Sequence, residues 1–509
     1  MTHLSNIFLT EPEQPAQRGS MVIDQGLILP KTSDCQHDRE IDGAGGYVVP
    51  GMIDSHLHLV YGAESQLQLD LSKVRSREAF EQAIFERHQT LPAERWLIAS
   101  GWNETQWEDH VLPDLSWLRA AGHRPVICHR ADLHAMVVND AVLQRAGIDR
   151  QRRDPDGGRI VRWTTGANSG LPTGLLVEAA AWHLVNPIIP TVSVQARQQA
   201  LAVAQGQLNA QGLTAVRSME YRREVEEVLM PMRDQLTLRT RVVLLDRDWP
   251  LDVSFAEAFE DSDMLAMAGH KAFVDGTMGS GTARLHAPYN DANDSVGQWV
   301  EMATDDTFEK WGGFLAEKGL TPVMHVIGDA ALTRAIDMVE AHQWALSPTF
   351  EHAQQIQPED VARLSGQFVS MQPEHRRSDA PALLQKLGAA RIKQSFPLRS
   401  LVQNGAVLAF GSDWPVVSSD PWLGMAAAMV CPAIEGFDKH QCLTLEESWR
   451  AYTQDAARVC GFTQSGTLKP GNVADLVIID RDPRAIDWTC ERPKVLLTMV
   501  GGHVVYDAR

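Results

Sequence analysis

The sequence predicts an α/β protein built around a (β/α)8 barrel, with a small β domain made from both ends of the chain. Two observations lead to this fold class. From about Trp96 onward, short β-branched runs alternate with amphipathic stretches of helical period, which is typical of a parallel sheet with crossover helices. Near both termini the helical period is weak and strand-like runs with turn residues prevail. A doubly wound open sheet is the alternative to the barrel.

Strand signals along the chain slightly exceed the eight that a barrel needs, so one or two of them are expected to lie elsewhere. The candidate strands are residues 47–54, 96–101, 125–129, 213–218, 239–245, 270–274, 322–326, 368–372 and 406–412. Helical windows at 194–211, 305–318, 330–341 and 445–459 lie between them. Thr444, with Glu447 three residues later, is the expected N-cap of the last window.

The two ends of the chain are expected to pair. Residues 21–29, 473–479 and 495–506 are strand-like and contain the turn residues Asp24-Gln25-Gly26 and Gly501-Gly502. We therefore expect residues 1–50 and 463–509 to form the β domain and residues 51–462 to form the barrel. Within the barrel segment, residues 102–190 are rich in Gly, Pro, Asp and Arg and suggest an elaborated loop region over one barrel end, where substrate specificity usually resides.

Composition narrows the class of function. The 509 residues carry a formal net charge of −19, which argues against a nucleic-acid partner because such partners require a basic face. No segment contains 18 consecutive apolar residues, and the first 15 residues do not resemble a signal peptide. Six cysteines are scattered without a C-x-x-C pair, which suits reduced thiols. We expect a cytoplasmic protein without a membrane partner that acts on a small molecule; homo-oligomerisation is left open.

His56 and His58 directly follow the apolar run at 47–54. Residues i and i+2 of a strand point the same way, so both imidazoles can face one ion at the carboxyl end of a barrel strand. Two exposed loop histidines are the alternative. His325, His352 and Asp413 also end predicted strands, and together with the pair they supply the imidazole and carboxylate ligands that borderline cations prefer.

Lys271 lies within an apolar run, where an unpaired charge would be costly. It is the sixth candidate for the metal site. A salt bridge to Asp275 or to another carboxylate is the alternative interpretation.

These residues lie in motifs that resemble the amidohydrolase superfamily, in particular its YtcJ-like group, which includes N-substituted formamide deformylase. The motifs span nearly the whole chain: Val49-Pro50-Gly51-Met52-Ile53-Asp54-Ser55-His56-Leu57-His58, Gly101-Trp102 with Trp107, Arg130-Ala131-Asp132-Leu133-His134, Pro172-Thr173-Gly174-Leu175-Leu176-Val177-Glu178, Lys271 to Gly276, His325-Val326-Ile327-Gly328-Asp329-Ala330, Glu351-His352-Ala353-Gln354, Ser370-Met371-Gln372-Pro373, Gly411-Ser412-Asp413-Trp414-Pro415 and Gly471-Asn472-Val473-Ala474-Asp475-Leu476.

The resemblance implies a distorted barrel beside a β-sandwich assembled from both termini. It implies that His56 and His58 bind one metal ion, that His325 and His352 bind a second, and that Asp413 binds the first and acts as general acid/base. Lys271 matches the lysine that is carboxylated and bridges the ions in two-metal members. Zinc is the usual metal, with one or two ions per chain.

The chain departs from the group's pattern at two positions near the expected pocket. Gly281 stands where an arginine is common, with Arg284 three residues later, and Leu133 stands where a glycine usually precedes His134. Neither departure changes a metal ligand, but both make it uncertain which substrate the pocket accepts.

The function predicted from these residues is metal-dependent hydrolysis of a non-peptide C–N bond in a small amide, formamide or cyclic amide. A bound divalent ion lowers the pKa of its water from 15.7 to about 7, and Asp413 would move the proton to the leaving group. His134 and Trp102, and more weakly Asp275 and Glu178, are candidates for holding the substrate, with packing as the alternative. Ester or lactone hydrolysis or deamination on the same scaffold, and a metal-free non-catalytic relative, are the competing functions.

Overall fold

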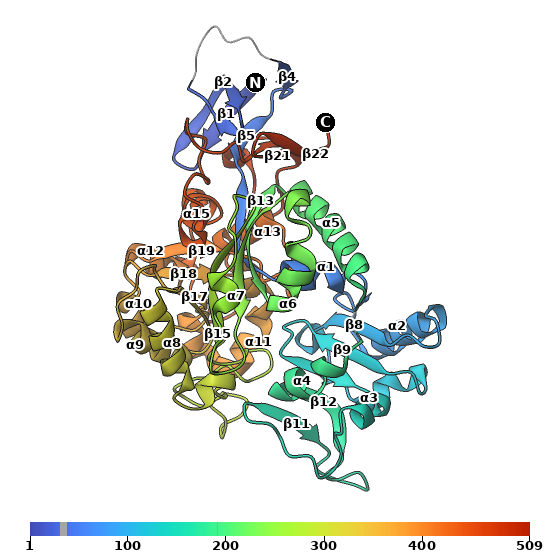
Figure 1. Cartoon of the computed structure of the whole chain (residues 1–509). Helices are drawn as coiled ribbons and strands as arrows, with labels where there is room; N and C mark the ends of the chain where they lie inside the picture. Colours follow the sequence, from blue (N-terminus) through green and yellow to red (C-terminus); the bar gives the residue numbers. More distant parts are fainter. Residues whose placement is uncertain (31–37, 191) are drawn as a thin grey trace.

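The computed structural model describes residues 1–30, 38–190 and 192–509 and contains three sheets (Figure 1). The central one is the predicted barrel. Its eight strands run parallel to their neighbours in the order β6 (Met52–Leu57), β13 (Leu213–Glu220), β14 (Arg239–Leu245), β15 (Leu265–Phe273), β16 (Pro322–Val326), β17 (Thr349–His352), β18 (Phe368–Met371) and β19 (Val407–Phe410).

The first and last barrel strands meet just beyond their carboxyl ends. The Asp413 N–H donates to the His56 carbonyl at 2.7 Å. The Ser412 N–H and the His56 N–H both donate to the buried Asp54 carboxylate, at 3.1 and 3.0 Å. These bonds link the segment after β19 to β6, so the sheet is nearly closed at the end where the predicted site residues lie.

The barrel helices agree with the predicted windows. They are α5 (Val194–Ala210), α8 (Thr307–Lys318), α9 (Asp329–Glu340), and the pair α14 (Leu445–Ala451) and α15 (Gln454–Cys460). Thr444 and Glu447 form the expected capping box at the start of α14. Further helices are α1 (Leu59–Ser65), α6 (Arg222–Glu224), α7 (Ser254–Glu257), α10 (Pro358–Arg363), α11 (Pro373–Arg391), α12 (Leu398–Gln403) and α13 (Pro421–Met429). In the described parts of the chain, none of the helices is long and apolar enough to cross a membrane.

Both ends of the chain pair in one sheet at the top of Figure 1. Its strands are β1 (Thr2–Glu11), β2 (Gln14–Asp24), β3 (Leu27–Ile28), β4 (Arg39–Asp42), β5 (Tyr47–Pro50), β20 (Leu476–Ile479), β21 (Val495–Val500) and β22 (His503–Asp507). The antiparallel pair β5 and β20 joins the N-terminal and C-terminal parts, with Tyr47 opposite Ile479. The termini thus form a single mixed sheet. The β-sandwich implied by the family resemblance, in which two sheets pack face to face, stays a prediction.

The third sheet corrects the interpretation of residues 102–190 as an elaborated loop. It contains β7 (Leu69–Asp70), β8 (Leu97–Trp102), β9 (Val126–Arg130), β10 (Ala135–Val138), β11 (Gly158–Arg162) and β12 (Pro172–Glu178), with α2 (Arg77–Thr90), α3 (Asp140–Arg145) and α4 (Ala179–Leu184). Two of the strands predicted for the barrel, 96–101 and 125–129, belong to this inserted sheet. It lies beside the barrel at the lower right of Figure 1.

Candidate metal centre

The predicted ligands come together at the carboxyl ends of the barrel strands. His56 lies in β6 with His58 just after it, Lys271 lies in β15, His325 in β16, His352 in β17, and Asp413 follows β19. The donor atoms of His56, His58 and Asp413 all lie within 4.8 Å of one another. The Asp413 Oδ1 is 3.3 Å from Nε2 of each of these two histidines.

The other nitrogen of each of these two histidines is held by the protein. His56 Nδ1 lies 2.5 Å from a Glu351 carboxylate oxygen, and His58 Nδ1 lies 3.2 Å from the Met219 carbonyl. Both oxygens can only accept from a ring N–H here, so Nε2 of each ring is the atom that faces Asp413 and that carries the lone pair when the ring is neutral. This arrangement of the ring nitrogens is the one that metal-binding histidines require.

A second group of donors shares Asp413. It contains His352 and His375, whose donor atoms lie with those of Asp413 within 4.8 Å of one another. His352 Nδ1 and Nε2 and His375 Nε2 are buried and have no hydrogen-bond partner among the described residues. Buried polar atoms without a partner are costly and are rare in native proteins, so these nitrogens fit a divalent cation.

His375 was not predicted as a site residue. It lies near the start of α11, directly after β18, and its Nε2 is 3.7 Å from Asp413 Oδ2. The motif Ser370-Met371-Gln372-Pro373 ends two residues before it. His325 takes a different position, because its Nε2 lies 3.2 Å from the Gly276 carbonyl and only its Nδ1 is left for a ligand.

Lys271 is buried beside the imidazoles rather than paired with Asp275. Its Nζ lies 3.1 Å from His56 Nε2. Burial lowers the pKa of Lys271 to about 8, although Glu351 and Asp413 act in the opposite direction. The shift makes the neutral amine, the form that can be carboxylated, more accessible near neutral pH than in an ordinary lysine.

Glu351 and Arg217 hold His56 in position through hydrogen bonds. Neither residue was predicted as part of the site from the sequence. Both side chains are buried. One Glu351 oxygen contacts His56, and the other accepts from Arg217, which also donates to the Ser55 carbonyl at 2.9 Å. Glu351 precedes the predicted ligand His352 in β17, so the two residues point to opposite faces of the strand.

The electrostatics of the site keep Asp413 ionised and favour the neutral form of His58, His325 and His352. For His56, burial and Lys271 lower the pKa, but Glu351 and Asp413 outweigh them and raise it above its ordinary value. Burial alone would raise the pKa of Asp413, but His56 and His58 hold it well below its ordinary value. Burial lowers the pKa of His325 and His352 well below their ordinary values, and neighbouring charges lower it further. Ionised carboxylate and neutral imidazole are the protonation states in which these groups bind metals.

Two cavities meet at this centre, and both are lined by His134, His325, His352 and Asp413. The first chamber has a volume of about 320 Å³ and lies between the barrel and the inserted sheet. Apolar and aromatic residues such as Leu133, Trp182 and Phe273 supply most of its exposed surface, and charged residues such as Glu220, Glu224 and Arg247 line it as well. Such a lining suits an apolar part of a substrate.

The second chamber is smaller, about 120 Å³, and its lining is more polar than that of the first. Asp132 also lines both chambers, and the residues that line only the second include Arg130, Gln354, His375 and Asp379. Burial raises the pKa of Asp379 above its ordinary value, although His375 and Arg130 oppose the shift.

The four residues predicted to hold the substrate take different positions. His134 lines both chambers, and its Nδ1 lies 2.8 Å from a Glu178 carboxylate oxygen. Burial would lower the pKa of His134, but Glu178 raises it above its ordinary value. Glu178 itself lines neither chamber, so it can affect a substrate only by positioning His134. Its other carboxylate oxygen accepts from the Thr282 hydroxyl at 2.5 Å.

Trp102 and Asp275 are not among the residues that line either chamber. The Trp102 indole donates to the Cys128 carbonyl at 2.8 Å and packs against Trp107 inside the inserted sheet. The Asp275 carboxylate accepts from the N–H groups of Ile327, Gly328 and Arg284 at 2.7–3.0 Å. Both geometries favour the packing alternative, so neither residue is part of the substrate site proposed below.

The two departures from the group's pattern also differ in their positions. Leu133 lines the first chamber with a φ of +62°, a left-handed conformation that glycine adopts most easily. Gly281 has a φ of +68° and lines neither chamber. Arg284 stacks on Trp299 and donates to the Gly297 carbonyl, so it does not reach the metal centre in place of the missing arginine.

Comparison with known proteins decides the family. The sequence profile of the amidohydrolase family matches residues 39–506. The chain belongs to the amidohydrolase family. It is 32% identical over 503 residues to the putative amidohydrolase YtcJ of Bacillus subtilis, covering 92% of this chain and 90% of the relative. It is 25% identical over 509 residues to N-substituted formamide deformylase of Arthrobacter pascens, again covering 92% of this chain and 90% of the relative.

The fold of this chain is also seen in a solved structure. An uncharacterized metal-dependent hydrolase from Pyrococcus horikoshii superposes with a TM-score of 0.76 at 24% identity, covering 96% of this chain and 99% of that one. The YtcJ-like group inferred from the motifs is confirmed by these matches, and the chain is a hydrolase by family.

Proposed function

We propose that this amidohydrolase is a metal-dependent enzyme that hydrolyses a C–N bond other than a peptide bond in a small molecule. The observation that carries the proposal is the pair of donor groups that share Asp413 where two cavities meet. The similarity to N-substituted formamide deformylase supports a C–N bond as the target.

His56, His58 and Asp413 would hold one divalent ion, for which zinc is the expected metal on the basis of nitrogen and carboxylate ligands. His352, with His375 or with Nδ1 of His325, would hold a second. Lys271 lies beside His56 and would be a further ligand once its neutral amine has added CO2. When bound, such ions supply an acidified water as nucleophile and polarise the substrate carbonyl.

Asp413 would move the proton. Its carboxylate is ionised, and it is positioned by the bond from its own N–H to the His56 carbonyl. It accepts a proton as the nucleophile attacks and delivers it to the leaving nitrogen, which makes the amine a better leaving group. Although burial opposes the shift, Glu178 raises the pKa of His134, and the protonated ring would donate a hydrogen bond from Nε2 to the substrate at the wall common to both chambers.

The test is turnover by the Asp413→Asn variant on a panel of N-substituted formamides, cyclic amides, esters and lactones. Asparagine has nearly the same shape but cannot take the proton, so a loss of at least about 100-fold in kcat is expected with normal folding. Full activity in the variant would refute the role of Asp413. Turnover of esters or lactones alone would replace the C–N assignment with the competing hydrolase reaction.

A further inference from the structure

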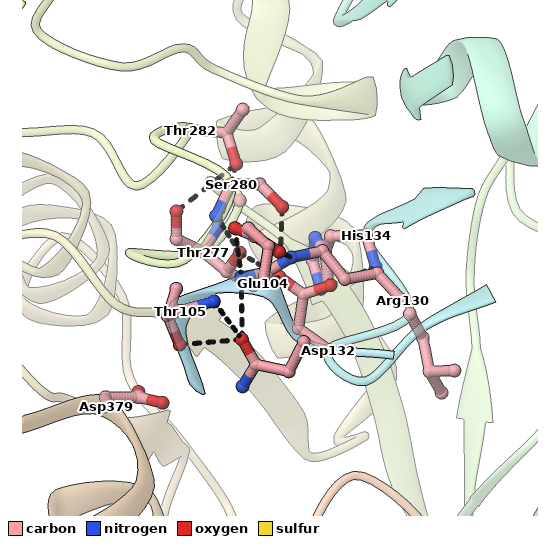
Figure 2. Close-up of polar contacts among 12 residues, drawn as sticks. Glu104, Thr105, Arg130, Asp132, His134, Thr277, Ser280, Thr282 and Asp379 are labelled. Carbon is pink, nitrogen blue, oxygen red and sulfur yellow. Dashed lines mark hydrogen bonds and ion pairs between the residues drawn. The ribbon is translucent and has the colours of Figure 1, made fainter. Parts of the chain in front are cut away.

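The second chamber contains a carboxylate that no cation neutralises. Among the described residues, Asp379 accepts only from the Ser378 hydroxyl at 3.1 Å and the Gln354 side-chain amide at 3.4 Å, and it forms no ion pair. Figure 2 shows Asp379 apart from the hydrogen-bonded network around Asp132. A carboxylate at the wall of a small cavity without a positive partner is electrostatically unfavourable, which leaves room for a cationic ligand.

Arg130 does not supply the missing charge. Its guanidinium donates to both oxygens of Glu104, at 2.9 and 3.0 Å, and also to Asp132 at 2.5 Å. Asp132 in turn accepts from Thr277 at 2.7 Å and Ser280 at 2.9 Å (Figure 2). Arg130 and Asp132 therefore belong to a closed network, while Asp379 keeps its acceptor capacity.

Gln354 is an independent sign of a ligand. Its side chain is 2% exposed and lines the same chamber, and its Oε1 has no hydrogen-bond partner among the described residues. The contact with Asp379 at 3.4 Å sets the amide orientation, because a carboxylate can only accept; the same side-chain nitrogen lies 3.3 Å from His375 Nδ1. The chamber thus offers two unfilled acceptors, one neutral and one anionic.

We infer that the second chamber binds a protonated amine of the substrate, with Asp379 as its counter-ion and Gln354 Oε1 as a further acceptor. An ammonium group carries a positive charge and three N–H donors, which match these acceptors. The role of this ammonium site in placing the substrate for hydrolysis rests on the proposed function. A substrate with its C–N bond at Asp413 would place the apolar part in the first chamber and the ammonium group in the second.

The positive charge should make an ammonium ligand bind more tightly than a neutral ligand of the same size. An alcohol of the same size can satisfy one acceptor but leaves the Asp379 carboxylate, which is only partly exposed, without a counter-ion. We therefore expect the metal-loaded protein to bind n-butylammonium at least about tenfold more tightly than 1-butanol at constant chloride concentration. Thermal-shift titration measures both without requiring turnover. Equal binding of the two probes, or binding of neither, would overturn the inference.

The Asp379→Asn variant tests the residue. It removes the charge at nearly constant volume, and the dissociation constant for n-butylammonium should rise at least about thirtyfold. Asp379→Glu keeps the charge and should retain binding. Glu224→Gln is the matched control, because Glu224 lines the first chamber and pairs with Arg197. Loss of binding in the Glu224 variant but not in the Asp379→Asn variant would place the cation in the first chamber and refute the inference.

Because these measurements are of binding, they stand apart from the test of hydrolysis. A protein whose turnover depends on Asp413 but which does not discriminate the two probes would keep the proposed function and lose this inference. A protein that binds n-butylammonium through Asp379 but hydrolyses nothing in the panel would keep the cation site and lose the proposed reaction.

Discussion

At the scale of single residues, the site depends on groups that fix which nitrogen of each histidine faces the centre. His56 is held through Glu351, which is itself held by Arg217, and all three side chains are buried. Removing the charge of Glu351 would leave Arg217 without its carboxylate and would free the His56 ring to change its tautomer.

We predict that Glu351→Gln lowers the affinity for metal by about 10- to 100-fold, because the residue orients a ligand without being one. The free energy of unfolding should also fall, by about 3 kcal/mol, since a buried arginine loses its partner. Competition of the protein with a chelator of known affinity measures the first effect, and urea unfolding the second.

Glu359→Gln is the control for this change, because Glu359 is exposed at the start of α10. It should alter neither quantity measurably. Unchanged metal affinity in the Glu351 variant would mean that the carboxylate does not orient His56.

The sequence predicted the residues that face the centre but not those that hold them. His56, His58 and Asp413 could be found because each follows an apolar run at a strand end. Glu351 and Arg217 act from within strands, where the sequence alone does not say which neighbouring strand a side chain reaches. His375 was missed because it begins a helix rather than ending a strand.

At the scale of elements, the closure of the barrel is controlled by a glycine. A Cβ added at Gly411 would lie 2.5 Å from His56 N and 2.8 Å from His56 Cβ. Only glycine lets the end of β19 approach β6 so closely, and this approach places Asp413 beside His56. The short contact is with backbone, which cannot rotate away.

Gly411→Ala is therefore expected to destabilise the protein by about 1–3 kcal/mol and to weaken metal binding, because His56 must move. Thermal unfolding with and without added metal measures both effects. Gly206→Ala, in α5 with no atom within 4 Å of the added Cβ, should be neutral or stabilising by about 0.5–1 kcal/mol. Equal behaviour of the two variants would contradict the account of this contact.

The elements themselves were largely predictable, while their partners were not. The windows at 194–211 and 305–318 contain α5 and α8 nearly to the residue, and Thr444 caps α14 as expected. The runs at 96–101 and 125–129 are strands, yet they lie in the inserted sheet. Local strand signals do not encode which sheet a strand joins, since pairing depends on distant residues.

At the scale of the whole molecule, the terminal sheet is tied to the barrel by a buried ion pair. Arg239, at the start of β14, donates to both oxygens of Asp475 at 2.7 and 3.2 Å. Asp475 also accepts from the Gly501 N–H at 2.7 Å. One carboxylate thus links a barrel strand with the turn between β21 and β22.

Asp475→Asn should lower the free energy of unfolding by about 3 kcal/mol, because the buried Arg239 guanidinium loses its counter-charge. Urea unfolding followed by circular dichroism measures the loss. Asp507→Asn removes an exposed pair with Arg509 in the same sheet and should cost less than about 1 kcal/mol. A similar, small effect in both variants would show that the terminal sheet does not depend on this pair.

The proposed chemistry depends on a divalent metal held at the carboxyl end of this barrel, between the groups of His56 and His352. Elemental analysis of protein purified without chelator detects such a metal. We predict one or two equivalents of a divalent metal per chain, with a marked loss in the His56→Asn and His352→Asn variants. Absence of stoichiometric metal from the folded wild-type protein would contradict the claim and favour a non-catalytic relative of the family.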